Sequence, residues 1–278
     1  MMSLRRLLPT WTHAPLRRWR DRARLPRVAT RFADGGRRAA RWSAPDLVDR
    51  VEGGDDNPLA AYFAAHREGP GIWKWEHYFE IYHRHLERFR AREVSVLEIG
   101  IYSGGSLDMW REYFGPACRV TGIDIEPACR AYERPGVRIV IGDQGSDAFW
   151  DDFLARGERY DVLIDDGGHT PEQQLTTLRR VLPALAPGGV YLCEDVHGTR
   201  HAFTAEVAGL ADALNAFDVT GPATVAPSAF QASIHSVHFY PFVAVIEKRS
   251  AAPARLHAPR RGTEWQPFFD EAVPGGRE

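Results

Sequence analysis

The sequence predicts an α/β fold: a mostly parallel sheet, covered by helices on both faces and closed by an antiparallel β-hairpin. Five runs rich in valine, isoleucine and leucine recur along the chain, at residues 94–100, 119–125, 137–143, 160–166 and 188–195. Segments of helical length separate them, and strands that are apolar throughout are typical of parallel sheets buried on both faces. A last segment, SIHSVHFYPFVAVIEK, contains two β-type runs with no helix between them. These two runs are therefore expected to pair antiparallel.

The composition indicates an ordinary globular protein. Of 278 residues, 44% are hydrophobic and 26% are charged, which argues against a fibrous or wholly disordered chain. No apolar stretch approaches the roughly 20 residues needed to cross a bilayer, and the opening MMSLRRLLPTW lacks the apolar run of a secretory signal. Three cysteines without CxxC spacing suggest neither a disulfide framework nor a cysteine metal site. We therefore expect a cytoplasmic protein that does not bind membranes.

The charge distribution divides the chain into three parts. Residues 1–42 carry twelve arginines against two acidic residues, which we interpret as a poorly ordered leader rather than a nucleic-acid-binding tail. Residues 43–72 contain turn signals such as EGGDDNP and REGPG. From Trp73, aromatic residues recur at helical intervals. The prediction is an Arg-rich segment and linker at 1–72, a folded domain at 73–250 and a tail at 251–278.

A glycine-rich loop follows the first predicted strand. It reads Glu98-Ile-Gly-Ile-Tyr-Ser-Gly-Gly-Ser106, and glycines allow a backbone to turn sharply and approach a ligand closely. The spacing is not that of a dinucleotide-binding GxGxxG turn. Asp124 ends the second strand, where a carboxylate can accept hydrogen bonds from ribose hydroxyls, and Asp143 and Gln144 follow the third. Together these positions predict a nucleoside site.

The motifs of residues 73–248 resemble a known enzyme family. ExGxxxGGS, GIDI and GDQ are similar to class I S-adenosylmethionine-dependent methyltransferases, which have a Rossmann-like seven-stranded sheet. With KWEHYFEIYHRHLERF, DVLIDDGGH and GGVYLCEDVH, the chain resembles the bacterial macrolide sugar O-methyltransferases of the mycinamicin VI and demethylmacrocin type, a group related to cephalosporin-hydroxylase-like sequences. The resemblance implies S-adenosylmethionine as cofactor. It implies cofactor-binding residues at Glu98, Gly100, Gly104, Gly105, Asp124, Asp143 and Gln144.

Two acidic pairs complete the predicted site. Asp165 and Asp166 end the fourth strand and Glu194 and Asp195 the fifth, and these strands are neighbours in the methyltransferase strand order. Clustered carboxylates repel one another unless a cation neutralises them, and oxygen ligands favour Mg²⁺. With the family pattern, this predicts Asp166, Glu194 and Asp195 as metal ligands and His169 as general base. Strand alternation turns Asp165 to the other face, as a supporting or cofactor-edge residue.

The predicted reaction is Mg²⁺-dependent methylation of a sugar hydroxyl on a small-molecule glycoside or saccharide, as in antibiotic biosynthesis. Two alternatives stay open: methylation of a non-sugar diol, and a non-catalytic module that only binds the cofactor. A short-chain oxidoreductase is excluded because neither lysine, Lys74 or Lys248, has a tyrosine four residues before it. An iron oxygenase built on His85-Leu-Glu is disfavoured by its place in a helix. A catechol-type enzyme would use a lysine base, and none is expected near these loops. Lys74, His77 and Tyr78 precede the first strand, and two roles stay open for them: closing over the cofactor, or lying at the edge of the core. A homo-oligomer is left open.

Overall fold

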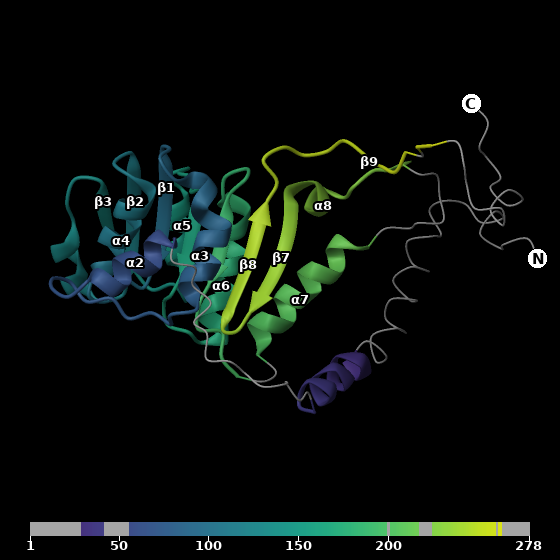
Figure 1. The fold of residues 1–278 in the computed structure, drawn as a ribbon, viewed down its shortest axis with the longest axis horizontal. Coiled ribbons are helices and arrows are strands. Elements are labelled where there is room, and N and C mark those ends of the chain that lie inside the picture. The colour runs from purple at the N-terminus through teal and green to yellow at the C-terminus, as the bar shows by residue number, and fades with distance from the viewer. Residues whose placement is uncertain (1–28, 42–55, 199–200, 217–223, 260, 263–278) are drawn as a thin grey trace, which may run out of the picture. The chain divides into compact units, whose positions relative to one another are not determined.

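The computed structural model describes residues 29–41, 56–198, 201–216, 224–259 and 261–262 (Figure 1). The chain divides into two compact units, residues 1–51 and residues 52–278. In the first unit, residues 29–39 form an α-helix; the rest of the predicted Arg-rich segment and most of the predicted tail lie outside the described residues. No helix in the described ranges has both the length and the apolarity to cross a membrane.

The second unit is built on a seven-stranded sheet, as predicted. Its strands are β1 (Val94–Ile99), β2 (Cys118–Asp124), β3 (Val137–Ile141), β4 (Val162–Asp165), β5 (Val190–Cys193), β7 (Ile234–Tyr240) and β8 (Val243–Lys248). They run in the order β3-β2-β1-β4-β5-β8-β7, and β8 pairs antiparallel with both of its neighbours. The predicted hairpin is therefore confirmed as β7–β8. A separate two-stranded sheet joins β6 (Thr224–Val225) to β9 (Leu256–His257).

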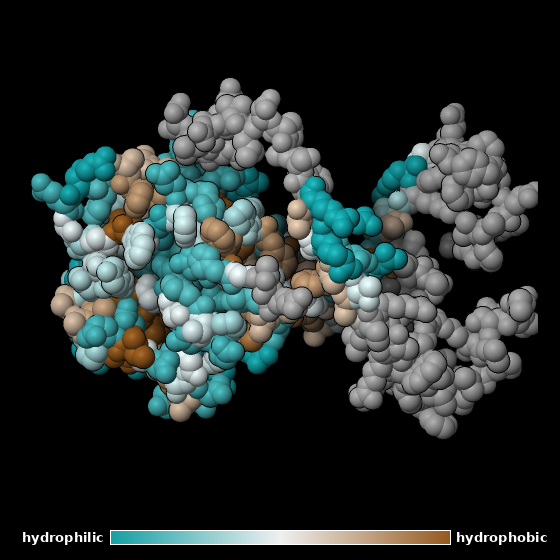
Figure 2. All heavy atoms as spheres, turned by 90° about the horizontal axis from the view of Figure 1, so that it is seen from below, coloured by the Kyte–Doolittle hydropathy of each residue, from teal (hydrophilic) through white to brown (hydrophobic). Residues whose placement is uncertain are grey.

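Helices cover both faces of the large sheet (Figure 1). They are α2 (Pro58–Ala65), α3 (Tyr78–Leu86), α4 (Gly105–Phe114), α5 (Asp147–Leu154), α6 (Pro171–Val181), α7 (Ala202–Leu214) and α8 (Ala229–Ser233). One buried cluster packs α2, α3 and α4 on one face, around Trp110, and a second packs α5, α6 and α7 on the other, around Trp150. Alternation along β1 supplies both clusters, since Val96 faces the first and Leu97 the second. On the face shown in Figure 2, apolar patches are interspersed with hydrophilic side chains.

Regular secondary structure begins earlier in the second unit than the sequence suggested. Residues 43–72 were predicted to be linker, but α2 lies within them and buries Leu59 completely. The turn signal DDNP is in fact a helix start: the Asn57 side chain accepts hydrogen bonds from the amides of the first turn, and Pro58 occupies the first helical position. The side-chain amide of Asn57 also donates from Nδ2 to the carbonyl of Phe79, 2.8 Å away, which ties α2 to α3.

The helix predicted from Trp73 begins only at Tyr78. Trp73, Lys74 and Trp75 therefore precede α3 in non-helical backbone. A helical start would have fixed these three side chains on different faces of one cylinder, about 100° apart. The non-helical segment instead allows all three to reach the same cavity, which is described below.

A buried polar network joins α3 to the β7–β8 hairpin. His85 is 4% exposed; its Nδ1 lies 2.7 Å from Glu247 Oε1 and its Nε2 lies 2.9 Å from the Tyr240 hydroxyl. Arg88 pairs with the same carboxylate at 3.2 Å. Burial alone would raise the pKa of Glu247, but the His85 hydrogen bond and the Arg88 charge outweigh it and lower the pKa to about 2. The carboxylate therefore stabilises the fold in its ionised form.

We expect this network to make the free energy of unfolding depend on pH in the acidic range. A carboxyl whose folded pKa is depressed stabilises the protein above its unfolded pKa, and that stabilisation is lost as pH falls toward the folded value. Glu247→Gln should therefore lower the free energy of unfolding near neutral pH, and its difference from wild type should shrink between pH 4.5 and about 2. Urea unfolding across this range measures it. Glu80→Gln, which loses an exposed bridge to Arg84, is the control; an equal pH dependence in both variants would contradict the expectation.

Candidate functional site

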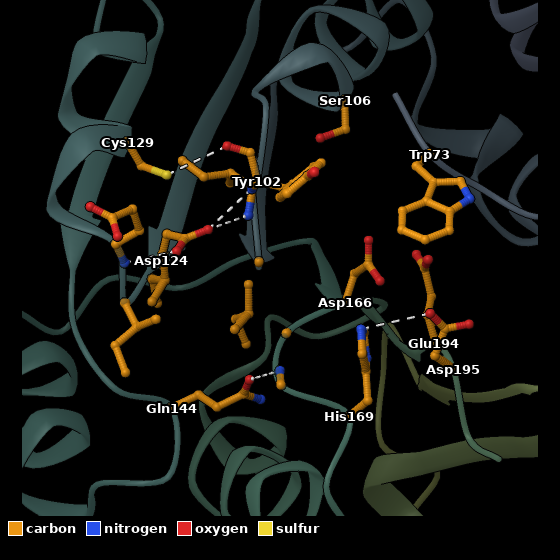
Figure 3. A pocket seen from close by; sticks show the side chains of 18 of the residues that line it. Trp73, Tyr102, Ser106, Asp124, Cys129, Gln144, Asp166, His169, Glu194 and Asp195 are labelled. Carbon is orange, nitrogen blue, oxygen red and sulfur yellow. Dashed lines mark hydrogen bonds and ion pairs between the residues drawn. The ribbon is translucent and has the colours of Figure 1, made fainter. Parts of the chain in front are cut away.

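A cavity of about 910 Å³ opens at the carboxyl ends of the parallel strands, the edge where open α/β sheets bind ligands. The loops after β1 to β5 line it, together with the segment before α3. The predicted residues that line it are Gly100, Asp124, Asp143, Gln144, Asp166, His169, Glu194 and Asp195. Figure 3 shows two ends of the cavity, with Asp124 and Gln144 at the first. At the second end lie His169 and three carboxylates that we call the acidic cluster: Asp166, Glu194 and Asp195. The remaining predicted residues, Glu98, Gly104, Gly105 and Asp165, are not among the residues that line the cavity.

At the first end, Asp124 organises the glycine-rich loop. Its Oδ2 accepts hydrogen bonds from the amides of Ile101 and Tyr102, at 3.0 and 3.1 Å. Its Oδ1 accepts the amide of Glu126 at 2.9 Å. A carboxylate has about four acceptor positions, so Asp124 retains capacity for one further donor such as a ribose hydroxyl. Ile125 beside it lines the cavity with 66% of its surface exposed, a residue that sequence reasoning missed.

Gly100 is the glycine that the fold requires most directly. Its φ is +80°, and a Cβ built there would lie 2.0 Å from the carbonyl oxygen of Asp166. The loops after β1 and β4 therefore approach each other as closely as backbone permits. Gly104 and Gly105 also allow close packing, against the Tyr132 ring and the Pro70 carbonyl. This packing gives the two glycines a structural reason independent of any ligand.

Gly100→Ala should be far more damaging than an alanine at another left-handed glycine. Gly198 has φ +94° with nothing within 4 Å of the Cβ position, so Gly198→Ala isolates the backbone cost of about 1 kcal/mol. Gly100→Ala adds a collision with Asp166, and we expect it to destabilise the protein by about 3 kcal/mol or more. Thermal and urea unfolding of both variants measure the difference. Equal losses would mean that the two loops separate without cost.

Glu98 lies beneath the cavity, fully buried. Its two oxygens accept hydrogen bonds from Ser106 Oγ at 3.0 Å and Trp110 Nε1 at 3.1 Å. Burial raises its pKa to about 7, although the nearby Lys74 charge and the Trp110 bond act in the opposite direction. The structure thus places Glu98 as an anchor between β1 and α4. A direct cofactor contact stays a prediction.

Asp165 supports Gln144 from below the cavity. Its Oδ1 accepts the Gln144 side-chain amide at 2.9 Å, and the Gln144 oxygen accepts the amide of Gly168 at 2.6 Å. Burial raises the pKa of Asp165 to about 7, against the effect of the Gln144 bond. Asp165 is 1% exposed, in keeping with the alternation that turns it away from Asp166. Gln144 is therefore held rigidly at the edge of the cavity.

At the second end, three potential metal donors converge. Ligand atoms of Asp166, His169 and Asp195 lie within 4.8 Å of one another, and His169 Nε2 is 3.7 Å from Asp195 Oδ2. His169 and Asp195 have φ values of +57° and +52°. Such backbone strain in residues other than glycine tends to collect at functional sites, where surrounding structure enforces it. Here it turns both side chains toward Asp166.

Lys74 is the residue that sequence reasoning got wrong. No lysine was expected near these loops, yet Lys74 Nζ lies 2.5 Å from Asp166 Oδ2 and 2.8 Å from Glu194 Oε2. Its side chain is 3% exposed. Burial alone would lower its pKa, but the two carboxylates outweigh burial and raise the pKa above its usual value. Lys74 therefore provides a fixed positive charge inside the acidic cluster.

Glu194 is the most buried member of the cluster, with no exposed surface. Burial acts to raise its pKa, and the Lys74 ammonium opposes this most strongly. Its second oxygen, Oε1, is buried, and among the described residues it makes no hydrogen bond of ordinary geometry, although the buried Tyr82 hydroxyl interacts with this carboxylate. A buried carboxylate oxygen that lacks such a hydrogen bond, together with the donors of Asp166 and Asp195, suits a hard cation that prefers oxygen. The residues present thus fit Mg²⁺, although Lys74 already engages one oxygen of Glu194 and one of Asp166.

Two further side chains orient Asp195, one from the segment before α3 and one from the first residue of α3. The Tyr78 hydroxyl donates to Asp195 Oδ1 at 2.7 Å, and Trp75 Nε1 donates to the same oxygen at 3.1 Å. Burial, reinforced by this hydrogen bond, raises the pKa of Tyr78 above its usual value, so the phenol stays a donor. Asp195 Oδ2 is left to face His169. The sequence analysis left the role of Tyr78 open and gave Trp75 no role beyond the aromatic spacing.

Comparison with known proteins identifies the domain. Residues 97–196 match the family model described as a methyltransferase domain. The chain contains a methyltransferase domain. The match runs from β1 to just past Asp195, so it includes every residue that was predicted for the cofactor and metal sites.

The methyltransferase domain is similar to curated O-methyltransferases. One is the 8-demethyl-8-(2-methoxy-alpha-L-rhamnosyl)-tetracenomycin-C 3'-O-methyltransferase of Streptomyces olivaceus, 33% identical over 74% of this chain and 57% of that protein. Another is the demethylmacrocin O-methyltransferase of Streptomyces fradiae, 35% identical over 51% of this chain and 36% of that protein. The chain thus spans only part of the length of these relatives. The resemblance to this group is confirmed.

A solved structure agrees with the fold. The MycE methyltransferase from the mycinamycin biosynthetic pathway, in complex with Mg and SAH, superposes with a TM-score of 0.57 at 26% identity. The match covers 69% of this chain and 54% of that protein. The Rossmann-like methyltransferase fold is therefore confirmed for the second unit.

Proposed function

We propose that this protein is an S-adenosylmethionine-dependent, Mg²⁺-dependent O-methyltransferase that acts on a sugar hydroxyl of a glycosylated natural product or saccharide. The observation that carries the proposal is the division of one cavity into a nucleoside-type end and an acidic end (Figure 3). The Streptomyces olivaceus relative is named as the 3'-O-methyltransferase of a rhamnosyl tetracenomycin, the Streptomyces fradiae relative is named as an O-methyltransferase, and the MycE structure contains both Mg and SAH. An enzyme that joins a nucleoside cofactor to a metal-held hydroxyl needs both ends within one cavity.

At the nucleoside end, Asp124 is proposed to receive the ribose hydroxyls, and Gln144 with Asp143 to border the adenine. At the acidic end, Asp166, Glu194 and Asp195 are proposed to hold Mg²⁺. When bound, S-adenosylmethionine supplies an electrophilic methyl group, and Mg²⁺ lowers the pKa of a hydroxyl that it contacts. The protein's own contribution is to align the two partners and to exclude water from between them.

His169 is proposed as the proton acceptor. As the hydroxyl oxygen forms its bond to the methyl carbon, the carbon–sulfur bond breaks, S-adenosylhomocysteine leaves and the hydroxyl proton passes to His169. The His169 side chain is 40% exposed, so it can return that proton to solvent. Lys74 is a poor alternative, because its side chain is 3% exposed and its ammonium is bound by two carboxylates. Asp195 Oδ2 lies 3.7 Å from His169 Nε2, where it can orient the imidazole ring.

Mass spectrometry provides the decisive experiment. The protein is incubated with S-adenosylmethionine, Mg²⁺ and a panel of glycosides and saccharides, with and without EDTA. A product heavier by one methylene unit, formed only with metal, is expected. Methylation of a catechol but not of any glycoside would favour the non-sugar diol, and cofactor binding without turnover would favour a non-catalytic module.

A further inference from the structure

Large apolar side chains stand exposed at the acidic end of the cavity. Trp73 and Trp75 both line the cavity, with 87% and 51% of their surfaces exposed. Phe242, at the tip of the β7–β8 hairpin, is 38% exposed, and its ring centroid lies 5.4 Å from that of Trp75. His197, a further lining residue, lies 4.6 Å from Phe242, centroid to centroid. We call Trp73, Trp75, His197 and Phe242 the aromatic rim.

The backbone of the hairpin tip is strained where it holds Phe242 in the rim. Phe242 has φ +63°, an uncommon conformation for a bulky residue. The amide of Val196 donates to the Phe242 carbonyl at 2.9 Å, and His77 Nε2 lies 3.0 Å from the Pro241 carbonyl. These contacts clamp the hairpin tip against the residue that follows Asp195. The fold thus enforces a strained backbone to keep an aromatic ring beside the acidic cluster.

The rim and the carboxylates together suit an amphipathic ligand. Ligand cavities are lined largely by apolar and aromatic groups, with a few polar groups that fix orientation. Aromatic faces carry negative charge density and attract the weakly positive C–H groups of a ligand. Asp166 and Asp195 lie within reach of the same space and can address hydroxyl groups. A ligand with C–H groups on one side and vicinal hydroxyls on the other satisfies both.

We infer that the aromatic rim is the acceptor subsite, and that it packs against an apolar face of the glycoside while the acidic cluster addresses its hydroxyls. The inference rests on the proposed function and specifies the chemistry of its acceptor. Either of two parts of a glycoside can provide this apolar face: the C–H face of a deoxysugar ring, or an apolar aglycone. A highly hydroxylated free sugar lacks both and should bind weakly.

Binding of two rhamnosides tests the rim directly. Methyl α-L-rhamnopyranoside offers a deoxysugar face alone, whereas p-nitrophenyl α-L-rhamnopyranoside adds an aromatic aglycone. Calorimetric titration uses the full chain with Mg²⁺ and S-adenosylhomocysteine. Removing one aromatic ring that the ligand half covers on binding should raise the dissociation constant about tenfold. We expect this loss for Trp73→Ala and Phe242→Ala, with unchanged affinity for S-adenosylhomocysteine.

Phe239→Ala is the matched control, because Phe239 is 47% exposed on the same hairpin, whereas the rings of Trp75 and His197 contact Phe242 and not Phe239. Trp73 is 87% exposed, so its removal should not unfold the protein and keeps the test valid if Phe242→Ala is unstable. A loss of affinity for both rhamnosides would show that the rim packs against the sugar face. A loss of affinity for the nitrophenyl compound alone would show that it packs against the aglycone. Affinities equal to that of Phe239→Ala, or no binding of either compound to wild type, would overturn the inference.

The outcomes also separate the rim from the proposed reaction. Rim-dependent binding of the rhamnosides without any methyl transfer would leave the subsite standing and reject the proposed function. Methyl transfer to either rhamnoside with the same KM in wild type, Trp73→Ala and Phe242→Ala would reject the subsite and leave the function standing.

Discussion

Replacing His169 should reduce methyl transfer by about 10²- to 10⁴-fold, the usual contribution of a positioned general base. His169 lies at the acidic end of the cavity, away from Asp124 and Gln144 (Figure 3), so affinity for S-adenosylhomocysteine should not change. Alanine is one replacement. Asparagine is the better one, because it tolerates the left-handed backbone at φ +57° and cannot accept a proton near neutral pH.

Single-turnover methyl transfer and calorimetric binding of S-adenosylhomocysteine give the two readouts. Added imidazole should restore part of the lost rate if His169 acts as a base, whereas it would not restore a merely structural defect. His235→Ala serves as the control, since His235 is exposed on β7 and does not line the cavity. A rate within twofold of wild type in both His169 variants would remove His169 from this role.

Replacing Lys74 with methionine should destabilise the metal-free protein by about 3 kcal/mol or more. Removing one partner of a buried ion pair leaves the other charge without compensation, which is among the costliest single changes. Here one ammonium neutralises both Asp166 and Glu194, and Glu194 has no exposed surface. Mg²⁺ should reduce the loss, because a divalent cation can neutralise the same carboxylates.

Urea unfolding in EDTA and in excess Mg²⁺ measures this effect, and calorimetric titration of Mg²⁺ gives a second, independent readout. Freed from Lys74, the carboxylate oxygens should bind Mg²⁺ more tightly. The double variant Lys74→Met with Glu194→Gln should regain much of the lost stability. Lys248→Met, which loses bonds only to backbone carbonyls such as that of Leu185, 2.7 Å away, is the control. A Lys74→Met protein as stable as wild type in EDTA would show that the cluster does not need this charge.

The parallel strands could be read from the chain because their signal is local. Four of the five apolar runs contain the whole strand that forms, and the fifth strand, β2, begins one residue before its run, at Cys118. The segments of helical length between the runs include α5 (Asp147–Leu154). The acidic pairs follow their strands directly, so the strand order alone brings Asp166 and Asp195 to one cavity. The start of the domain was misplaced, because Asn57-Pro58 resembles a turn and is a helix cap.

The sequence by itself determined the sheet architecture and placed the acidic residues at the ends of its strands. It could do so because apolar periodicity and strand ends are properties of residues that are adjacent in the chain. Only the tertiary structure decided which charges pair. Lys74 meets Asp166 across 92 residues and Glu194 across 120, and His85 meets Glu247 across 162. Such pairings form because distant segments are buried in the same small volume, where an uncompensated charge is too costly to remain. No spacing along the chain encodes that shared volume.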